Sequence, residues 1–167
     1  MRKQRGFSLI ELLIVVAIIL VIAAIAIPNL LRSRIAANEA SAVNSLRTIG
    51  TAEVTYALTY PNNGFANDLS LLGGTGTSSS SAGALLLDNV LGCSSATSPG
   101  SQCNKTGYVF MVTGPAYVAG SPVASYNTTA NPITVDQTGK RFFYTDASGV
   151  IRYNMTQTAS STDFALQ

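Results

Sequence analysis

Histidine and tryptophan are both absent from this chain of 167 residues, and only 11% of its residues are charged. Histidine is the commonest general acid or base and a common metal ligand, so its absence removes the usual centre of a catalytic site. The serines at 78–81 lack the Gly-x-Ser-x-Gly frame of a nucleophile, and Gly73–Gly76 lacks the lysine of a phosphate loop. The composition therefore favours a protein that is not an enzyme and holds no cofactor.

Cysteine and positive charge are also scarce. The two cysteines, Cys93 and Cys103, cannot supply the four ligands of a structural zinc site, so we expect no metal. The net charge is +2, but Arg2, Lys3 and Arg5 contribute three of the ten basic residues. Without these three, seven basic and eight acidic residues remain, a net charge of −1. Such a chain has no excess of positive charge for nucleic-acid binding.

One long apolar run, Phe7 to Ile27, dominates the N-terminal part of the chain. Its 21 residues would rise about 31 Å as a helix, enough to cross the roughly 30 Å hydrocarbon core of a bilayer. The basic residues ahead of the run place that end in the cytoplasm and the rest outside. Glu11 lies inside the run, where a charge costs on the order of 2.5–3.5 kcal/mol. Because no basic residue lies within one helical turn, we expect its partner on another molecule.

The segment GFSLIELLIVV (residues 6–16), led by three basic residues, carries a family resemblance. It is similar to the class III leader of type IV pilins and type II secretion pseudopilins. The similarity continues through the segment AIPNL (26–30) and extends over roughly residues 1–60. The resemblance implies cleavage by a prepilin peptidase between Gly6 and Phe7, and N-methylation of the new Phe7 amine. It also implies that the Glu11 carboxylate pairs with this amine in an assembled filament, and that Pro28 kinks the helix.

The resemblance further implies a structural subunit of a type IV pilus that serves adhesion, twitching motility or DNA uptake. Its expected partners are copies of itself, the prepilin peptidase/N-methyltransferase, and an inner-membrane assembly platform with its ATPase. The lipid bilayer holds the subunit before assembly. We expect a single-pass inner-membrane protein with a cytoplasmic N-terminus that later becomes part of an extracellular pilus.

Several other interpretations remain open. One is a type II secretion pseudopilin, although the major pseudopilins carry a tryptophan and an aspartate-rich C-terminal calcium site. Here tryptophan is absent, and only Asp163 follows Asp146. Another is a membrane-anchored binding module that never polymerises. A plain membrane anchor and a secretory signal peptide cut after the segment AIA (24–26) are further alternatives, but the long run and Glu11 disfavour the signal peptide.

The helix is predicted to continue past the kink and to end near Tyr60, before the segment PNNG (61–64). Its second half is amphipathic, with one apolar face formed by Ile35, Ala42, Leu46, Ile49 and Tyr56. Residues 61–106 form a connection in which 73–83, rich in glycine and serine, is expected to be mobile. Later in this connection, the segment Leu85–Leu91 predicts a short helix.

From Gly107 onward the pattern has period two. Residues 108–112 predict a strand, 117–126 and 132–135 are weaker strand candidates, and 141–153 predict a hairpin that turns at 146–149. The expected fold is α+β, with a long kinked N-terminal helix packed on a three- to four-stranded antiparallel sheet. The chain would divide into a leader (1–6), the helix (7–60), the connection (61–106), and the sheet with its tail (107–167).

The two cysteines lie in the part of the chain expected outside the cytoplasm, where disulfides form. A bridge between Cys93 and Cys103 would close a loop of about ten residues and contribute roughly 2.5–3 kcal/mol in the chain-entropy model. Two free thiols are the alternative.

Overall fold

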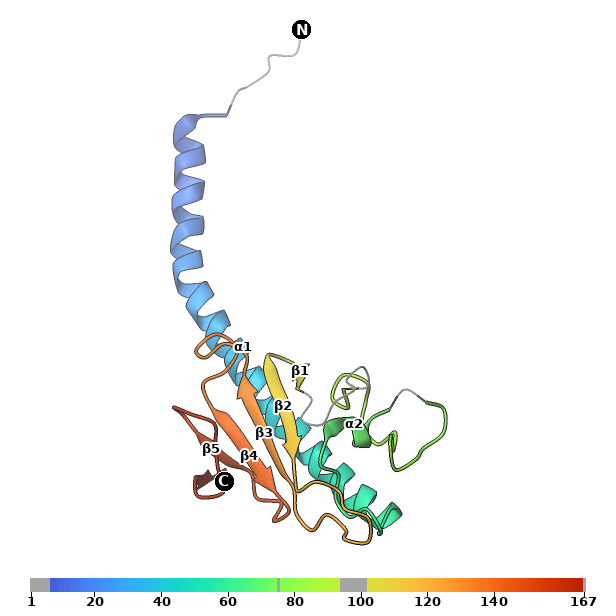
Figure 1. Cartoon of the computed structure of the whole chain (residues 1–167). Coiled ribbons are helices and arrows are strands. Elements are labelled where there is room, and N and C mark those ends of the chain that lie inside the picture. The colour runs from blue at the N-terminus through green and yellow to red at the C-terminus, as the bar shows by residue number, and fades with distance from the viewer. Residues whose placement is uncertain (1–6, 75, 94–101, 167) are drawn as a thin grey trace. The chain divides into compact units, whose positions relative to one another are not determined.

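The computed structural model of the chain describes residues 7–74, 76–93 and 102–166 (Figure 1). The chain forms two compact units, Met1–Arg34 and Ile35–Gln167. The predicted leader, including Gly6, lies outside the described residues.

Helix α1 (Leu9–Thr59) supplies the described part of the first unit after Ser8 and continues into the second unit. Its length follows from a sequence rich in alanine, leucine and isoleucine, with no glycine between Gly6 and Gly50. Pro28 lies inside α1, and the helix continues on both sides of it. The kink expected at this proline stays a prediction. The end of the helix at Thr59 agrees with the boundary expected from the sequence.

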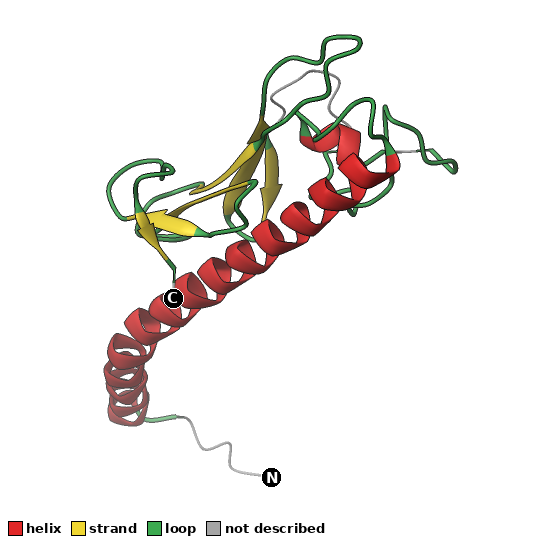
Figure 2. Cartoon of the chain, turned by 90° about the horizontal axis from the view of Figure 1, so that it is seen from below, coloured by secondary structure: helices red, strands yellow, loops and turns green. Residues whose placement is uncertain are grey.

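In the second unit, α1 buries one face against the sheet (Figure 2). The five residues predicted to form this face are all buried, as the period of the sequence requires. Aromatic side chains of the sheet meet them, and Tyr108, Phe110 and Phe143 are fully buried. Burying each such ring contributes about 1.5–3 kcal/mol. The core of the second unit therefore lies between α1 and one face of the sheet.

Among the described residues the sheet has six strands, not the three or four expected. They are β1 (Cys103–Lys105), β2 (Tyr108–Thr113), β3 (Asn127–Pro132), β4 (Phe142–Asp146), β5 (Arg152–Asn154) and β6 (Phe164–Ala165). Neighbours pair antiparallel in chain order. The additional strands are too short to show a period of two in the sequence. Their pairing with longer neighbours defines them.

The sequence correctly located β2 and the β4–β5 hairpin but misplaced β3. The structure has no regular strand at 117–126, and 132–135 contributes only Pro132 to β3. The central strand β3 instead has the polar sequence NTTANP. Its threonines suit a strand, but its pairing along most of β2 and β4 decides the assignment. In the segment 117–126, Val123 pairs with the loop after α1, and its carbonyl accepts a hydrogen bond from Phe65 N (3.0 Å).

The connection contains a short helix, but not where the sequence predicted it. Helix α2 is Leu69–Leu72, and the carboxylate of Asp68 accepts a hydrogen bond from Ser70 N (2.8 Å) at its N-cap. The predicted helix at Leu85–Leu91 is wrong. The backbone N–H groups of Ala84, Leu85 and Leu86 each donate 2.8 Å hydrogen bonds to the carbonyls of Leu71, Gly73 and Leu72, in that order. These tertiary hydrogen bonds hold the leucine segment in a non-helical conformation, in which Leu85 has a φ of 55°.

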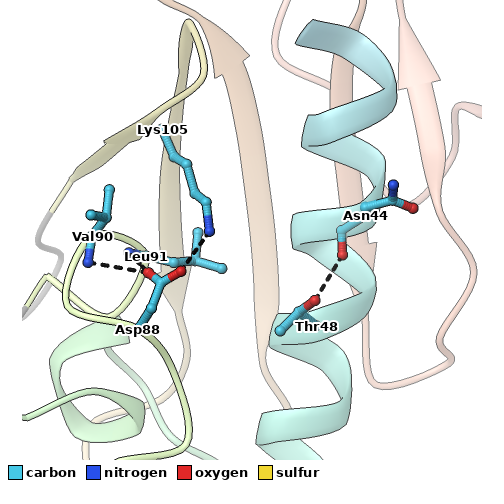
Figure 3. Close-up of polar contacts among 6 residues, drawn as sticks. All are labelled: Asn44, Thr48, Asp88, Val90, Leu91 and Lys105. Carbon is cyan, nitrogen blue, oxygen red and sulfur yellow. Dashed lines mark hydrogen bonds and ion pairs between the residues drawn. The ribbon is translucent and has the colours of Figure 1, made fainter. Parts of the chain in front are cut away.

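Asp88 organises the chain that follows (Figure 3). One of its oxygens accepts hydrogen bonds from Leu91 N (2.6 Å) and Val90 N (3.1 Å), and the other binds Lys105 Nζ (2.7 Å). The carbonyl of Asp88 accepts from Gly92 N (2.7 Å), which closes a single turn. Lys105 belongs to β1, so this carboxylate connects the turn to the edge of the sheet.

A disulfide joins Cys93 to Cys103 beside this turn, with their Cα atoms 5.4 Å apart. Gly92, next to Cys93, packs directly on Gly73. A Cβ atom on Gly73 would lie 2.5 Å from the Gly92 carbonyl oxygen, so a side chain there requires the backbone to shift. The disulfide, the carboxylate of Asp88 and this glycine contact together attach the connection to the rest of the second unit.

Candidate functional site

The most unusual surface of the chain is the first part of α1. Its large apolar side chains are exposed from Leu9 to Leu31, and Leu9, Leu20 and Ile27 expose 79%, 64% and 66% of their surface. An 18-residue window of this helix has a mean hydropathy of 3.3, and none of that window is buried. Among the described residues, α1 is the helix long and apolar enough to cross a membrane. The exposure of such a large apolar surface to water is strongly unfavourable.

Two shallow hollows lie along this part of α1. One of about 430 Å³ runs from Leu9 to Leu20, and one of about 330 Å³ runs from Leu13 to Ile22. Leu13 and Ala17 line both hollows. The small side chain of Ala17 lets another backbone approach, as small residues do at helix contacts within membranes. Each hollow can receive the ridge of a second apolar helix.

Glu11 has a partner that we did not expect from the sequence. Its Oε2 atom accepts a hydrogen bond from Ser8 N (2.9 Å), while Ser8 O accepts from Leu12 N (3.3 Å) as α1 begins. This is one half of a capping box, in which a Glu three residues after a Ser cap bonds back to the cap. The Ser-x-x-Glu spacing at residues 8–11 was the signal that our interpretation missed. Thus Glu11 is not without an intrachain partner, although that partner carries no charge.

Phe7 lies beside this cap and is 77% exposed. It precedes Glu11 by four residues, about one helical turn, as the sequence indicated. The structure therefore places Phe7, Ser8 and Glu11 together at the start of α1. Gly6, the other residue of the expected cleavage position, lies outside the described residues.

Two buried carboxylates in the second half of α1 were not identified from the sequence. Glu39 is buried and binds three groups at once. Its Oε1 accepts from Lys140 N (2.9 Å) and Arg141 N (3.2 Å), and its Oε2 forms an ion pair with Arg141 Nε (2.7 Å). The Arg141 guanidinium also lies over the rings of Phe143 (5.5 Å) and Tyr153 (5.7 Å). This Glu39–Arg141 clasp connects α1 to the start of β4.

Glu53 is fully buried, and its Oε2 accepts a hydrogen bond from Ala66 N (2.8 Å). Its Oε1 has no hydrogen-bond partner among the described residues. Burial raises the pKa of Glu53 from 4.5 to about 8, and the bond from Ala66 only partly offsets this. The sequence does carry a signal for both glutamates. Glu39 follows the buried Ile35 by four residues, and Glu53 follows the buried Ile49 by four, so the helical period places both on the apolar face.

A metal site is the other kind of functional site to consider among the described residues. In the described ranges 7–74, 76–93 and 102–166, no group of three or more histidine, cysteine, aspartate or glutamate side chains could hold a metal ion. The distinctive chemistry of the described chain lies instead in the exposed apolar helix and the carboxylate at its start.

Comparison with known proteins also points to the N-terminal part of the chain. Residues 1–27 match the family model described as the prokaryotic N-terminal methylation motif. The chain is 44% identical over 54 residues to the type IV major pilin protein PilA of Myxococcus xanthus, covering 32% of this chain and 24% of that protein. It is 62% identical over 39 residues to the type IV wide pilus major component PilA4 of Thermus thermophilus, covering 23% of this chain and 30% of that protein.

These matches show that the chain carries a prokaryotic N-terminal methylation motif and is similar over part of its length to type IV pilins. The chain spans less than a third of the length of either relative, 24% and 30%. No solved structure matches the chain. The family model covers the residues before α1 and the first part of this helix. The matches to the two relatives cover 32% and 23% of this chain.

Proposed function

We propose that this chain is a structural subunit of a type IV pilus and acts by assembly rather than catalysis. The observation that carries the proposal is an N-terminal methylation motif on a helix whose apolar residues are exposed from Leu9 to Leu31. Its two relatives are named as a major pilin and as a major component of a pilus. The precursor resides in the inner membrane, and the mature subunit resides in an extracellular filament.

Assembly exchanges one apolar environment for another. In the bilayer, lipid covers the side chains of residues 9–31. In the filament, the same side chains contact the corresponding helices of neighbouring subunits. The hollows that share Ala17 give those helices places to interlock. An assembly ATPase and an inner-membrane platform supply the work and the guidance for this transfer.

Glu11 gives the assembly its register. Cleavage after Gly6 creates a positively charged amine on Phe7, and this amine pairs with a Glu11 carboxylate of the same or a neighbouring subunit. In an apolar core an unpaired charge is much less stable than a paired one, so subunits in the wrong register are disfavoured. The Ser8 N–H holds the carboxylate near the start of α1 before the amine partner arrives.

A type II secretion pseudopilin is the second candidate, because both classes share the same leader. The named functions of the two relatives do not favour it. A deletion strain complemented with this chain separates the two candidates. A pilus subunit appears in filaments sheared from intact cells, whereas a subunit confined to the cell envelope rejects the proposal.

Mass spectrometry of the sheared protein tests processing in the same experiment. We expect an N-terminus at Phe7 carrying one added methyl group. The matched variant Gly6→Glu should remain an uncleaved precursor in the inner membrane, because a side chain at that position blocks close approach of the backbone to a peptidase. A Gly6→Glu chain that still begins at Phe7 would contradict this account of the cleavage position.

A further inference from the structure

The face of the sheet that points away from α1 carries a polar hollow. Along β2 and β4 buried and half-buried residues alternate, and the buried ones face the core shared with α1. Thr113, Tyr144 and Asp146 occupy the half-buried positions, so their side chains lie on the opposite face. They line a hollow of about 540 Å³, within the usual range for small-molecule sites.

The hollow combines a carboxylate, an amide and an aromatic ring. Asn127 is paired in register with both Thr113 on β2 and Asp146 on β4, so the three side chains form a row across the sheet. Thr113 Oγ1 donates a hydrogen bond to Asn127 Oδ1 (2.6 Å), which leaves the amide N–H groups of Asn127 as donors. The Tyr144 side chain adds a ring two residues before Asp146 on the same face.

Asp146 keeps a fixed orientation and a negative charge. Its Oδ1 accepts a hydrogen bond from Ser148 N (2.9 Å). The hydrogen bonds from Ser148 lower the pKa of Asp146, and Tyr144 and Arg152 add to this lowering. The carboxylate is therefore ionised at neutral pH and accepts hydrogen bonds without needing to lose a proton.

The charges exclude most ligand classes. Asp146 is the one charged side chain among the described residues that line the hollow, so an anion is repelled. One carboxylate is too few for a calcium site. Arg152, which is paired with Tyr144 in register, weakens the attraction for a free cation. The remaining lining residues are neutral, and they comprise three serines, a second tyrosine and three residues without a polar side chain: Ser125, Ser148, Ser161, Tyr126, Gly114, Pro115 and Ala147. Closely spaced donors and acceptors beside a ring suit a neutral, polyhydroxylated ligand.

We propose that this hollow binds a neutral carbohydrate, with a hexopyranose ring against Tyr144 and adjacent hydroxyls on Asp146 and Asn127. The site lies on the sheet face opposite α1. If the chain assembles with its helices inward, as proposed above, the hollow stays accessible on the filament. Binding itself does not depend on assembly, so it can be tested on unassembled protein.

The test uses saturation-transfer NMR on the full chain in dodecylphosphocholine, a detergent that contains no sugar. The probes are the methyl glycosides of glucose, galactose and mannose, with methylammonium as a cationic comparison. Ser125→Phe fills the hollow from an exposed position, and Ser79→Phe is its control at an exposed serine outside the hollow. Asp146→Asn removes the charge, and Asp136→Asn is its control at an exposed aspartate elsewhere.

We expect saturation transfer to at least one of the three glycosides. Ser125→Phe should abolish it, and Asp146→Asn should weaken binding about tenfold, because bonds to a charged acceptor are lost. Both controls should bind like the unmodified chain. Circular dichroism of each variant verifies its fold. Three results overturn the proposal: no transfer to any glycoside, equal transfer in every variant, or Asp146-dependent binding of methylammonium alone.

Discussion

Glu11 combines a local role and an intermolecular role, and single substitutions can separate them. Its Oε2 atom accepts from Ser8 N at the start of α1, which any side-chain carbonyl or carboxylate oxygen could do. Pairing with the Phe7 amine of a mature subunit requires a negative charge. The residue therefore has one role in beginning the helix and a second, proposed role in assembly.

We predict that Glu11→Gln keeps the cap but enters filaments as poorly as Glu11→Val, while Glu11→Asp retains partial assembly. Both neutral variants should insert and be cleaved, because removing a charge favours insertion. Immunoblots of sheared filaments against total subunit measure the result. Normal filament yield from Glu11→Gln with reduced yield from Glu11→Val would show that Glu11 acts only as a cap.

Glu53 gives the second unit a pH dependence at neutral pH. Its pKa is about 8 in the folded chain and 4.5 as the reference for the unfolded one. Between these values the folded chain holds a proton that the unfolded chain has released. The free energy of unfolding therefore falls as the pH rises from about 4.5 to 8, by on the order of 5 kcal/mol.

We predict that Glu53→Gln removes this slope, because an amide does not titrate. Near pH 7 the variant should be more stable than the unmodified chain by about 3 kcal/mol, and near pH 4.5 the two should be equal. Urea unfolding of the full chain in detergent, followed by circular dichroism at several pH values, measures the difference. Parallel stability curves for the two proteins would contradict the prediction.

At the scale of elements, α1 combines two surfaces with opposite requirements. Its first part exposes apolar side chains, and its second part buries one face under the sheet. Threonines occupy much of the solvent side of the second part. Thr48, Thr51 and Thr55 each donate a hydrogen bond to the carbonyl four residues earlier, as Figure 3 shows for Thr48. The threonine hydroxyls therefore form their hydrogen bonds within the helix. Burial of apolar side chains and the Glu39–Arg141 clasp hold the other face of α1 against the sheet.

We predict that Arg141→Met lowers the free energy of unfolding by about 3–5 kcal/mol, because it leaves the buried Glu39 charge without its ionic partner. Lys140→Met is the matched control. Its ion pair with Asp136 is exposed and 3.6 Å long, so its loss should change stability by less than about 1 kcal/mol. Urea unfolding measures both variants. Equal effects would show that the clasp contributes no more than a surface pair.

At the scale of the whole chain, the disulfide attaches the connection to the sheet. Cys103 belongs to the edge strand β1, while Cys93 follows the turn organised by Asp88. Both cysteines are buried in the core of the second unit. The bridge therefore attaches Cys93 and the turn before it to the edge strand β1.

We predict that two thiols become available to alkylation only after reduction of the purified protein, as intact mass will show. Cys93→Ser should lower the stability of the second unit by about 2–3 kcal/mol while membrane insertion stays unchanged. The double variant with Cys103→Ser tests whether the loss comes from the bridge, since it should lose no more than the single variant. Free thiols in protein taken from the cell exterior would reject the pairing.

The sequence by itself determined the features that depend on local pattern. The run Phe7–Ile27 and the apolar face from Ile35 to Tyr56 follow from hydropathy and helical period. The methylation motif within residues 1–27 follows from a resemblance of the local sequence to a known leader. The β4–β5 hairpin follows from two strands with period-two patterns around a turn. Each of these signals lies within one segment, so no knowledge of distant contacts is needed to interpret it.

Only the tertiary structure decided the rest, because distant backbone and side-chain groups compete with local preference. The leucines at 85–87 form no helix because α2 and Gly73 accept their N–H groups. The polar segment 127–132 is a central strand because β2 and β4 pair with it on either side. Glu39 is tolerated in the core because Arg141, 102 residues later, meets it there. Hydrogen-bond and charge partners far apart in the chain carry no signal in a local pattern, and folding alone brings them together.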